Sequence, residues 1–224
     1  MDLKERAARE AVGYVKDGMV VGLGSGSTAS IAIKILGERV KDGMRIVGIP
    51  TSADSEILAK QVGISIGELK DHLVVNLTID GADEVDPDLN LIKGLGGALV
   101  REKIVASATE MEIIVVDDSK LVDHLCQKAP LPVEIVKFAH DATMRRLSEF
   151  GCKPNLRMKD GQLFVTDNGN YIADCKFERI DDPMTMEAEL NLVPGVVDNG
   201  LFVGIADKVI VASKDGIKTL ERKS

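Results

Sequence analysis

The sequence contains no apolar run of about 18 residues, the length needed to cross a bilayer, so we expect no membrane-spanning helix. Basic residues are outnumbered as well: 28 Lys and Arg stand against 36 Asp and Glu, a formal net charge of -8. This balance disfavours non-specific binding to nucleic acid or to an anionic membrane. The N-terminal segment, Met1 to Glu10, mixes acids and bases without an apolar stretch, so we expect no secretory signal and a cytoplasmic protein.

Residues that hold metals or form covalent intermediates are also scarce. Cys126, Cys152 and Cys175 are odd in number and lack C-x-x-C spacing, which favours reduced thiols in a cytosolic protein. The 3 histidines share no spacing suitable for zinc. The sequence has no G-x-S-x-G motif, so it gives no support to covalent hydrolase chemistry.

Strands and helices alternate regularly over the first half of the chain. Strands are predicted at 19–23, 45–49, 74–79 and 112–116, and helices at 27–40, 50–61 and 98–109. Near-continuous runs of Val and Ile, separated by helices, indicate a parallel sheet covered on both faces. The predicted fold class is therefore α/β, with a Rossmann-like, mostly parallel sheet.

The pattern changes after Lys120, and Pro130-Leu131-Pro132 is typical of a domain boundary because two prolines exclude regular helix. Asn and Gly in the turns at 159–161 and 167–170 are typical of hairpins. Strands are predicted at 133–136, 153–158, 163–165, 171–176, 202–205 and 208–212, and helices at 139–150 and 182–190. We expect a small α+β, ferredoxin-like domain over 129–201, and an α/β catalytic domain formed by 1–128 and 202–224.

The stretch from Asp80 to Glu102 concentrates charged residues beside glycines. Asp80 and Asp83 follow a predicted strand, and Lys93 directly precedes the turn Gly94-Leu95-Gly96-Gly97. Glu102 lies one turn into an apolar helix, and burial there raises a carboxyl pKa while a nearby lysine lowers it. General acid-base catalysis needs titratable groups close enough to tune one another, and lysine with backbone N–H groups neutralises an oxyanion or a phosphate. The stretch therefore predicts an active site.

For several of these charged residues, the alternative to a catalytic role is an exposed position without function. Glu84, Asp86 and Asp88 suit a solvated acidic turn, and Lys93 and Glu102 suit the surface of the molecule. The acidic loop does not match an EF-hand, because its sixth and twelfth positions carry Leu and Gly where Gly and Glu are required. On the residues alone a Mg²⁺ site stays open, since acids on one loop hold that ion with few protein ligands.

A second glycine-rich loop, 24–28, follows a predicted strand and opens a helix. The N–H groups at a helix start, the positive end of the helix dipole and three hydroxyl side chains suit a phosphate group. The alternative is a tight turn in which Ser27 or Thr28 caps the helix. The loop also satisfies the loose G-x-G-x-x-G/A pattern, but the second strand runs into Pro50-Thr51 without the carboxylate that binds ribose hydroxyls. We therefore do not expect NAD binding.

Together these segments closely resemble ribose-5-phosphate isomerase of the A type, in order and over nearly the whole length. The matching blocks are 24–28, 80–84, 93–97, 101–104, 117–120, 194–195 and 199–202. The resemblance implies an intramolecular oxidoreductase that interconverts D-ribose 5-phosphate and D-ribulose 5-phosphate in the non-oxidative pentose phosphate pathway. It implies no metal and no other cofactor, a sugar phosphate as the small-molecule partner, no nucleic acid or membrane partner, and a homodimer or homotetramer.

The resemblance also implies roles for single residues. The glutamate matching Glu102 is the general base, and Asp80, Asp83 and Lys93 complete the implied catalytic set. Which of the two aspartates opens the sugar ring is left open. Substrate contacts are implied for Ser25, Gly26, Ser27, Thr28, Asp80, Gly81, Ala82, Asp83, Lys93, Gly94, Leu95, Gly96, Lys120 and Lys4.

Two other classes of protein share the expected architecture by family analogy. A phosphosugar-sensing domain binds its ligand without turnover and normally accompanies a DNA-binding module, for which this acidic chain has no spare basic segment. A coenzyme A transferase needs a glutamate that forms a covalent thioester and room for a large nucleotide. Both are alternatives to the isomerase.

Overall fold

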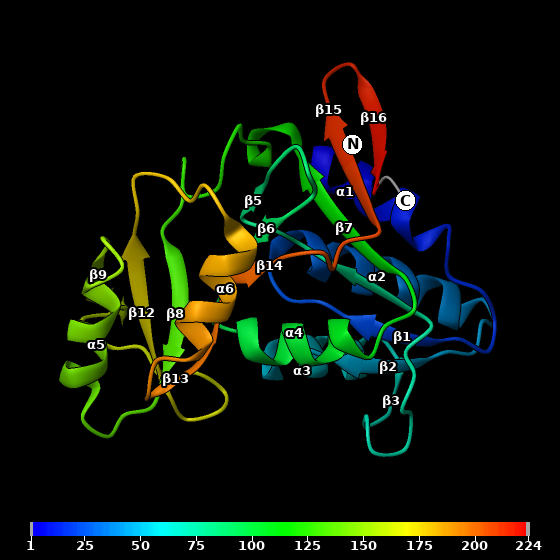
Figure 1. Cartoon of the computed structure of the whole chain (residues 1–224). Coiled ribbons are helices and arrows are strands. Elements are labelled where there is room, and N and C mark those ends of the chain that lie inside the picture. Colours follow the sequence, from blue (N-terminus) through cyan, green and yellow to red (C-terminus); the bar gives the residue numbers. More distant parts are fainter. Residues whose placement is uncertain (1, 223–224) are drawn as a thin grey trace. The chain divides into compact units, whose positions relative to one another are not determined.

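The computed structural model describes residues 2–222, which divide into two compact units (Figure 1). The first unit comprises the chain up to Ala82, Arg101–Lys120 and the chain from Ile205 onwards. The second unit comprises Asp83–Val100 and Leu121–Gly204. The division expected from the sequence instead assigns 83–100, 121–128 and 202–204 to the α/β domain, and that division stays a prediction.

A seven-stranded sheet forms the centre of the first unit, in the order β16-β15-β7-β4-β1-β2-β3 (Figure 1). Neighbouring strands are parallel except β15 and β16. The inner strands are runs of buried Val, Ile and Leu, because β-branched side chains fit the pleated surface. The strands are β1 (Val20–Leu23), β2 (Val47–Pro50), β3 (Ser65–Ile66), β4 (Leu77–Asp80), β7 (Glu112–Asp117), β15 (Lys208–Ser213) and β16 (Gly216–Glu221).

Helices cover both faces of this sheet. Val21 and Leu23 of β1 pack in one apolar cluster with residues of two helices, α1 (Leu3–Val12) and α2 (Ser27–Lys41). Val20 packs in a different cluster with Val105, which lies on α4 (Leu99–Ser107). Because successive side chains of a strand point to opposite faces, the two clusters lie on opposite sides of the sheet. The α/β fold with a mostly parallel sheet is confirmed.

The second unit is built mainly on an antiparallel sheet with the order β13-β8-β12-β9. A separate three-stranded antiparallel sheet has the order β14-β6-β5. The core of the second unit includes Leu131 and Val133 of β8, Leu147 of α5 and Leu190 of α6. The elements are β5 (Glu84–Val85), β6 (Leu91–Ile92), β8 (Leu131–Ile135), α5 (His140–Ser148), β9 (Lys153–Leu156), β10 (Met158–Lys159), β11 (Gln162–Leu163), β12 (Tyr171–Lys176), α6 (Pro183–Asn191), β13 (Val196–Asn199) and β14 (Leu201–Phe202). The expected smaller α+β part is present.

The turn at 167–170, expected from its Asn and Gly residues, is tied to the sheet by a buried carboxylate. Glu134 of β8 is fully buried, and its Oε1 accepts hydrogen bonds from Thr166 Oγ1 (3.0 Å), Asn168 Nδ2 (3.2 Å) and Asn170 Nδ2 (2.8 Å). A buried charge is tolerated when it is hydrogen-bonded in this way. The turn therefore depends on a residue more than 30 positions earlier in the chain.

Several elements were not expected from the sequence: α1, β3, β5, β6, β13, β16 and the short 3₁₀ helix η1 (Asp118–Lys120). The predicted strand at 74–79 is limited to Leu77–Asp80. Among residues 2–222, no helix has both the length and the apolar character needed to span a bilayer.

The three cysteines are free and buried in the second unit. Burial, with a smaller contribution from the nearby Glu84, raises the pKa of the Cys126 thiol to about 12. A thiol with a raised pKa is protonated at neutral pH and reacts slowly, because the thiolate is the nucleophile.

Because all three thiols are buried, we predict that the native protein at pH 8 resists Ellman's reagent, and that all 3 cysteines react once guanidinium chloride unfolds the chain. The measurement is the release of thionitrobenzoate with time in the presence and absence of denaturant. Rapid reaction of Cys126 in the native protein, located by peptide mapping, would contradict the burial described here.

Candidate active site

The loops after β1, β2, β4 and β7 leave the sheet of the first unit at one edge, because these strands are parallel. The chain passes from β1 to β2 on one side of β1, and it later returns to β4 on the other side. In open α/β sheets, such a reversal of strand order opens a crevice in which ligands bind. The loop 24–28 follows β1 and Asp80 ends β4, so two expected site segments lie at this position.

Asp80 holds the loop that follows β1. Its side chain is buried, and its Oδ1 accepts hydrogen bonds from the backbone N–H groups of Ser25 (3.0 Å) and Gly81 (2.7 Å). A Cβ at Gly24 would lie 2.3 Å from this same oxygen, so only glycine allows the loop to approach so closely. The structure thus brings Ser25, Asp80 and Gly81 together, with Ala82 next in the chain.

The loop 24–28 presents hydroxyl groups at the start of α2. The helix begins at Ser27, and Gly26, with a φ of 88°, is its N-cap without a side-chain cap. The alternative in which Ser27 or Thr28 caps the helix is therefore wrong. Lys4 of α1 donates a hydrogen bond from Nζ to Ser27 Oγ (2.9 Å). An ammonium, hydroxyl groups and the positive end of a helix dipole in one place favour a bound anion.

Sequence reasoning missed Thr51 and Ser52, which follow β2 at the same edge. Ser25 Oγ lies 2.8 Å from Thr51 Oγ1 and donates to Ser52 Oγ at 2.8 Å. These contacts fix the orientation of the Ser25 hydroxyl. The residues Pro50-Thr51-Ser52 by themselves predict only a helix start; the signal for a site is their position directly after the second parallel strand.

Glu102 lies in the first turn of α4 and is only 6% exposed. The alternative of a surface position is wrong for Glu102, since its side chain is buried and the neighbouring Arg101 and Lys103 are half-buried. Burial removes water from the carboxylate, and the start of a helix favours negative charge. Lys120 ends the short helix η1 after β7, so it also lies at the carboxyl edge of the sheet.

In the second unit, the structure places Asp83 beside Lys93 and the glycine turn. The antiparallel pairing of Glu84 with Ile92 sets Asp83 opposite Lys93, and Asp83 Oδ2 accepts a hydrogen bond from Leu95 N (2.9 Å). Lys93 is 3% exposed, and its Nζ lies 5.3 Å from the centroid of the Phe202 ring. The alternative of a surface lysine is therefore wrong.

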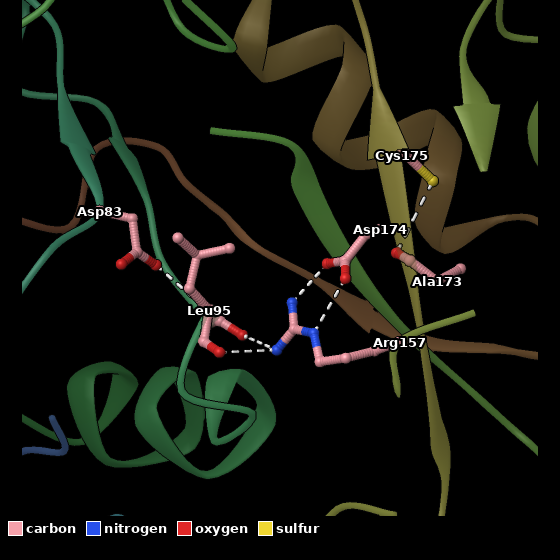
Figure 2. A network of polar contacts seen from close by, with 7 residues as sticks. Asp83, Leu95, Arg157, Ala173, Asp174 and Cys175 are labelled. Atoms are coloured by element: carbon pink, nitrogen blue, oxygen red, sulfur yellow. Dashed lines mark hydrogen bonds and ion pairs between the residues drawn. The ribbon is translucent and has the colours of Figure 1, made fainter. Parts of the chain in front are cut away.

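The turn after Lys93 has the backbone conformations that glycine favours. Gly94 and Gly97 have φ values of 104° and 85°, and Gly97 N donates to Gly94 O at 3.0 Å. Leu95 and Gly96, between them, are exposed. Arg157 donates hydrogen bonds to two carbonyl groups of this turn (Figure 2). Sequence reasoning did not identify Arg157, because its position is 60 residues or more from the turn.

The remaining acids of the expected acidic loop have structural roles. Glu84 is fully buried and accepts hydrogen bonds from the backbone N–H groups of Cys126 (2.7 Å), Lys128 and Ala129 (2.7 Å). Asp86 is 8% exposed, and its Oδ1 accepts from the backbone N–H of Asn90 (2.8 Å). A solvated turn is therefore wrong for Glu84 and Asp86. Within residues 2–222, no three His, Cys, Asp or Glu side chains are grouped so that they could hold a metal ion.

Comparison with known proteins gives consistent matches over the chain. The profile of the family described as Ribose 5-phosphate isomerase A (phosphoriboisomerase A) matches residues 47–216. A protein named ribose-5-phosphate isomerase A from Pyrococcus abyssi is 52% identical over 99% of this chain and 98% of its own length. Its namesake from Gloeobacter violaceus is 55% identical over 97% of this chain and 95% of its own length.

Solved structures are similar over the same extent. A D-ribose-5-phosphate isomerase in complex with phospho-erythronic acid has a TM-score of 0.96 at 49% identity, covering 99% of this chain and 100% of that chain. A ribose 5-phosphate isomerase from Plasmodium falciparum has a TM-score of 0.96 at 40% identity, covering 99% of each chain. The likeness therefore extends through both units.

The structural role of Glu84 generates a stability prediction. Glu84→Gln replaces one acceptor oxygen with an NH₂ group that faces backbone donors, so we expect a loss of about 2–4 kcal/mol in the free energy of unfolding. Asp88→Asn, at an exposed position of the same loop, is the matched control and should leave stability within about 0.5 kcal/mol. Urea unfolding followed by circular dichroism measures both; equal midpoints for the two variants would refute the role given to Glu84.

Proposed function

The chain belongs to the ribose 5-phosphate isomerase A family, and we propose that it uses Glu102 as the general base of its reaction. The reaction is the interconversion of D-ribose 5-phosphate and D-ribulose 5-phosphate. The relatives named above give no support to a phosphosugar sensor or a coenzyme A transferase. The observation that carries the proposal is the burial of Glu102 at the start of α4, which keeps the carboxylate away from bulk water beside the positive end of the helix dipole.

In the proposed mechanism, Glu102 removes the C2 proton of the open-chain aldose and returns it to C1 through a cis-enediolate. An aldose α-proton is only weakly acidic, so the negative charge that develops on oxygen must be stabilised. Lys93 and the backbone N–H of Gly96 would supply that stabilisation, as fixed donors do in oxyanion holes, whereas the N–H groups of Leu95 and Gly97 are donated to Asp83 and Gly94. The burial of Lys93 supports this role, because an ammonium acts more strongly away from water.

Asp80 or Asp83 is proposed to move protons between the two substrate oxygens and to help open the furanose ring. Both are already held by backbone N–H groups, Asp80 through Ser25 and Gly81, and Asp83 through Leu95. Carboxylates held in this way need little reorganisation when the substrate reacts.

The phosphate group is proposed to bind at the start of α2. Ser27 and Thr28, the backbone N–H groups at the start of α2 and the ammonium of Lys4 support this assignment, since Lys4 already contacts Ser27. Lys120, at the same edge of the sheet, is proposed as a further substrate contact.

The wider biological setting is also a proposal. We infer a cytoplasmic enzyme of the non-oxidative pentose phosphate pathway, and the three free, buried cysteines support a reducing compartment. We propose that the reaction needs no metal, because Lys93 and N–H donors can take the role of a Lewis acid. A homodimer or homotetramer is proposed from the family resemblance.

Glu102→Gln tests the base. The amide keeps the shape of the side chain but cannot accept the proton, so kcat should fall about 10²–10⁴-fold, while KM for ribose 5-phosphate changes little. Glu110→Gln, an exposed glutamate just beyond α4, is the matched control and should retain full activity. Direct detection of ribulose 5-phosphate gives both constants; a near-normal kcat in Glu102→Gln would remove Glu102 from the mechanism.

Turnover of ribose 5-phosphate with and without EDTA tests the reaction class and the role of metals. We expect the same kcat in both conditions. Activity lost to EDTA and restored by Mg²⁺ would contradict the metal-free mechanism. Saturable binding of ribose 5-phosphate by calorimetry without any turnover would instead indicate a sensor.

A further inference from the structure

Arg157, which is absent from the proposed set of catalytic residues, is bound to the glycine turn that follows Lys93. Its Nη1 donates hydrogen bonds to the carbonyl oxygens of Gly94 (2.7 Å) and Leu95 (2.9 Å). On its other side, Nε donates to Asp174 Oδ2 (3.0 Å) and Nη2 to Asp174 Oδ1. Figure 2 shows the guanidinium between the carboxylate of Asp174 and the turn. All four residues belong to the second unit.

The guanidinium itself is held rigidly. The Arg157 side chain is 11% exposed and that of Asp174 23%, and their bidentate, charge-assisted pairing fixes the plane of the guanidinium. The backbone of Arg157 is fixed too, since its N–H donates to Ile172 O (2.8 Å) and its carbonyl accepts from Phe164 N (2.9 Å). Arg157 is therefore a fixed support for the turn rather than a mobile surface cation.

The two hydrogen bonds to the turn determine where its N–H groups point. In a trans peptide, the C=O of one residue and the N–H of the next lie in one plane and point in opposite directions. Because the carbonyls of Gly94 and Leu95 face Arg157, the N–H groups of Leu95 and Gly96 must point away from it. The N–H of Leu95 indeed ends on Asp83 Oδ2 (2.9 Å). The N–H of Gly96, an exposed residue, is directed away from Arg157 in the same manner.

Phe164 supports the same turn from its far end. The Arg157 guanidinium lies 6.0 Å from the centroid of the Phe164 ring. A Cβ at Gly97 would lie 2.4 Å from the edge of that ring, so the ring is in contact with the turn. The turn is thus confined by Phe164 at Gly97 and by Arg157 at Gly94 and Leu95.

We propose that Arg157, oriented by Asp174, is a positioning residue that sets the peptide planes at Gly94-Leu95-Gly96. It thereby aligns the Gly96 N–H for the developing oxyanion and the Asp83 carboxylate for proton transfer. This inference rests on the isomerase activity proposed above. Without these contacts, the glycine-rich turn 94–97 would sample several peptide orientations. Ordering the turn during the reaction would then add to the activation free energy.

The test uses Arg157→Ala in the full-length protein, with Arg179→Ala as the matched control. Arg179 also forms an ion pair in the second unit, with Asp181, but that pair is exposed. In Arg157→Ala we expect kcat to fall about 30- to 300-fold, less than the roughly 10²–10³-fold loss that follows removal of an oxyanion donor, because the Gly96 N–H is displaced rather than removed. KM for ribose 5-phosphate and the inhibition constant of inorganic phosphate should stay within about three-fold, because the residues proposed for the phosphate are unchanged.

Chemical rescue separates positioning from a purely structural role. Ethylguanidinium at concentrations below those that denature the protein should restore kcat of Arg157→Ala by about ten-fold or more, and should not affect the wild type or Arg179→Ala. Arg157→Lys should remain impaired, because a single ammonium cannot bind two carbonyls and pair bidentately with a carboxylate. If Arg157→Ala does not fold, Asp174→Asn is measured instead, with a smaller loss of kcat and unchanged KM expected.

The outcomes are distinct. A wild type without turnover would overturn the proposed function and this inference with it. A wild type that turns over, with Arg157→Ala at normal kcat, would overturn the positioning role alone. The positioning role would also be overturned if Arg157→Ala lowered kcat/KM only by raising KM, or if Arg157→Lys were fully active.

Discussion

The parallel pairing of β1 with both β2 and β4 is the constraint on which the first unit depends. It places the loops after these strands at one edge, where Ser25, Thr51 and Asp80 meet through hydrogen bonds. The contact between Ser25 N and Asp80 Oδ1 leaves no space for a side chain at Gly24. One strand arrangement thus accounts for the glycine, the buried carboxylate and the hydroxyl groups at the start of α2.

In the second unit, side chains hold the short glycine turn 94–97 in one conformation. The turn has few contacts of its own, so residues distant in sequence must fix it. Asp83 binds the Leu95 N–H, Arg157 binds two carbonyls, and Phe164 contacts Gly97. Such preorganisation is what electrostatic stabilisation of an enediolate requires, since donors that move during the reaction lose part of their effect.

Most of the fold could be predicted from the sequence, because local patterns carry it: runs of Val and Ile predict the strands. The roles of Glu102 and Lys93 come from the family resemblance and stay proposals. Contacts between distant residues carried no such pattern. Neither the carboxylate of Glu134 under the turn at 167–170 nor Arg157 beside Leu95 leaves a local sequence signal. Burial was equally hidden: Glu84 and Asp86 are typical of a solvated loop until their backbone partners are known.

The central claim is that a carboxylate moves a proton through an enediolate, and hydrogen exchange with solvent tests it most directly. Ribose 5-phosphate is incubated with the enzyme in D₂O and followed by NMR over many turnovers. We predict that deuterium enters C1 of ribulose 5-phosphate and C2 of ribose 5-phosphate, and that Glu102→Gln shows neither exchange at a comparable rate. Complete retention of the original hydrogen after many interconversions would indicate a hydride shift and would contradict the account.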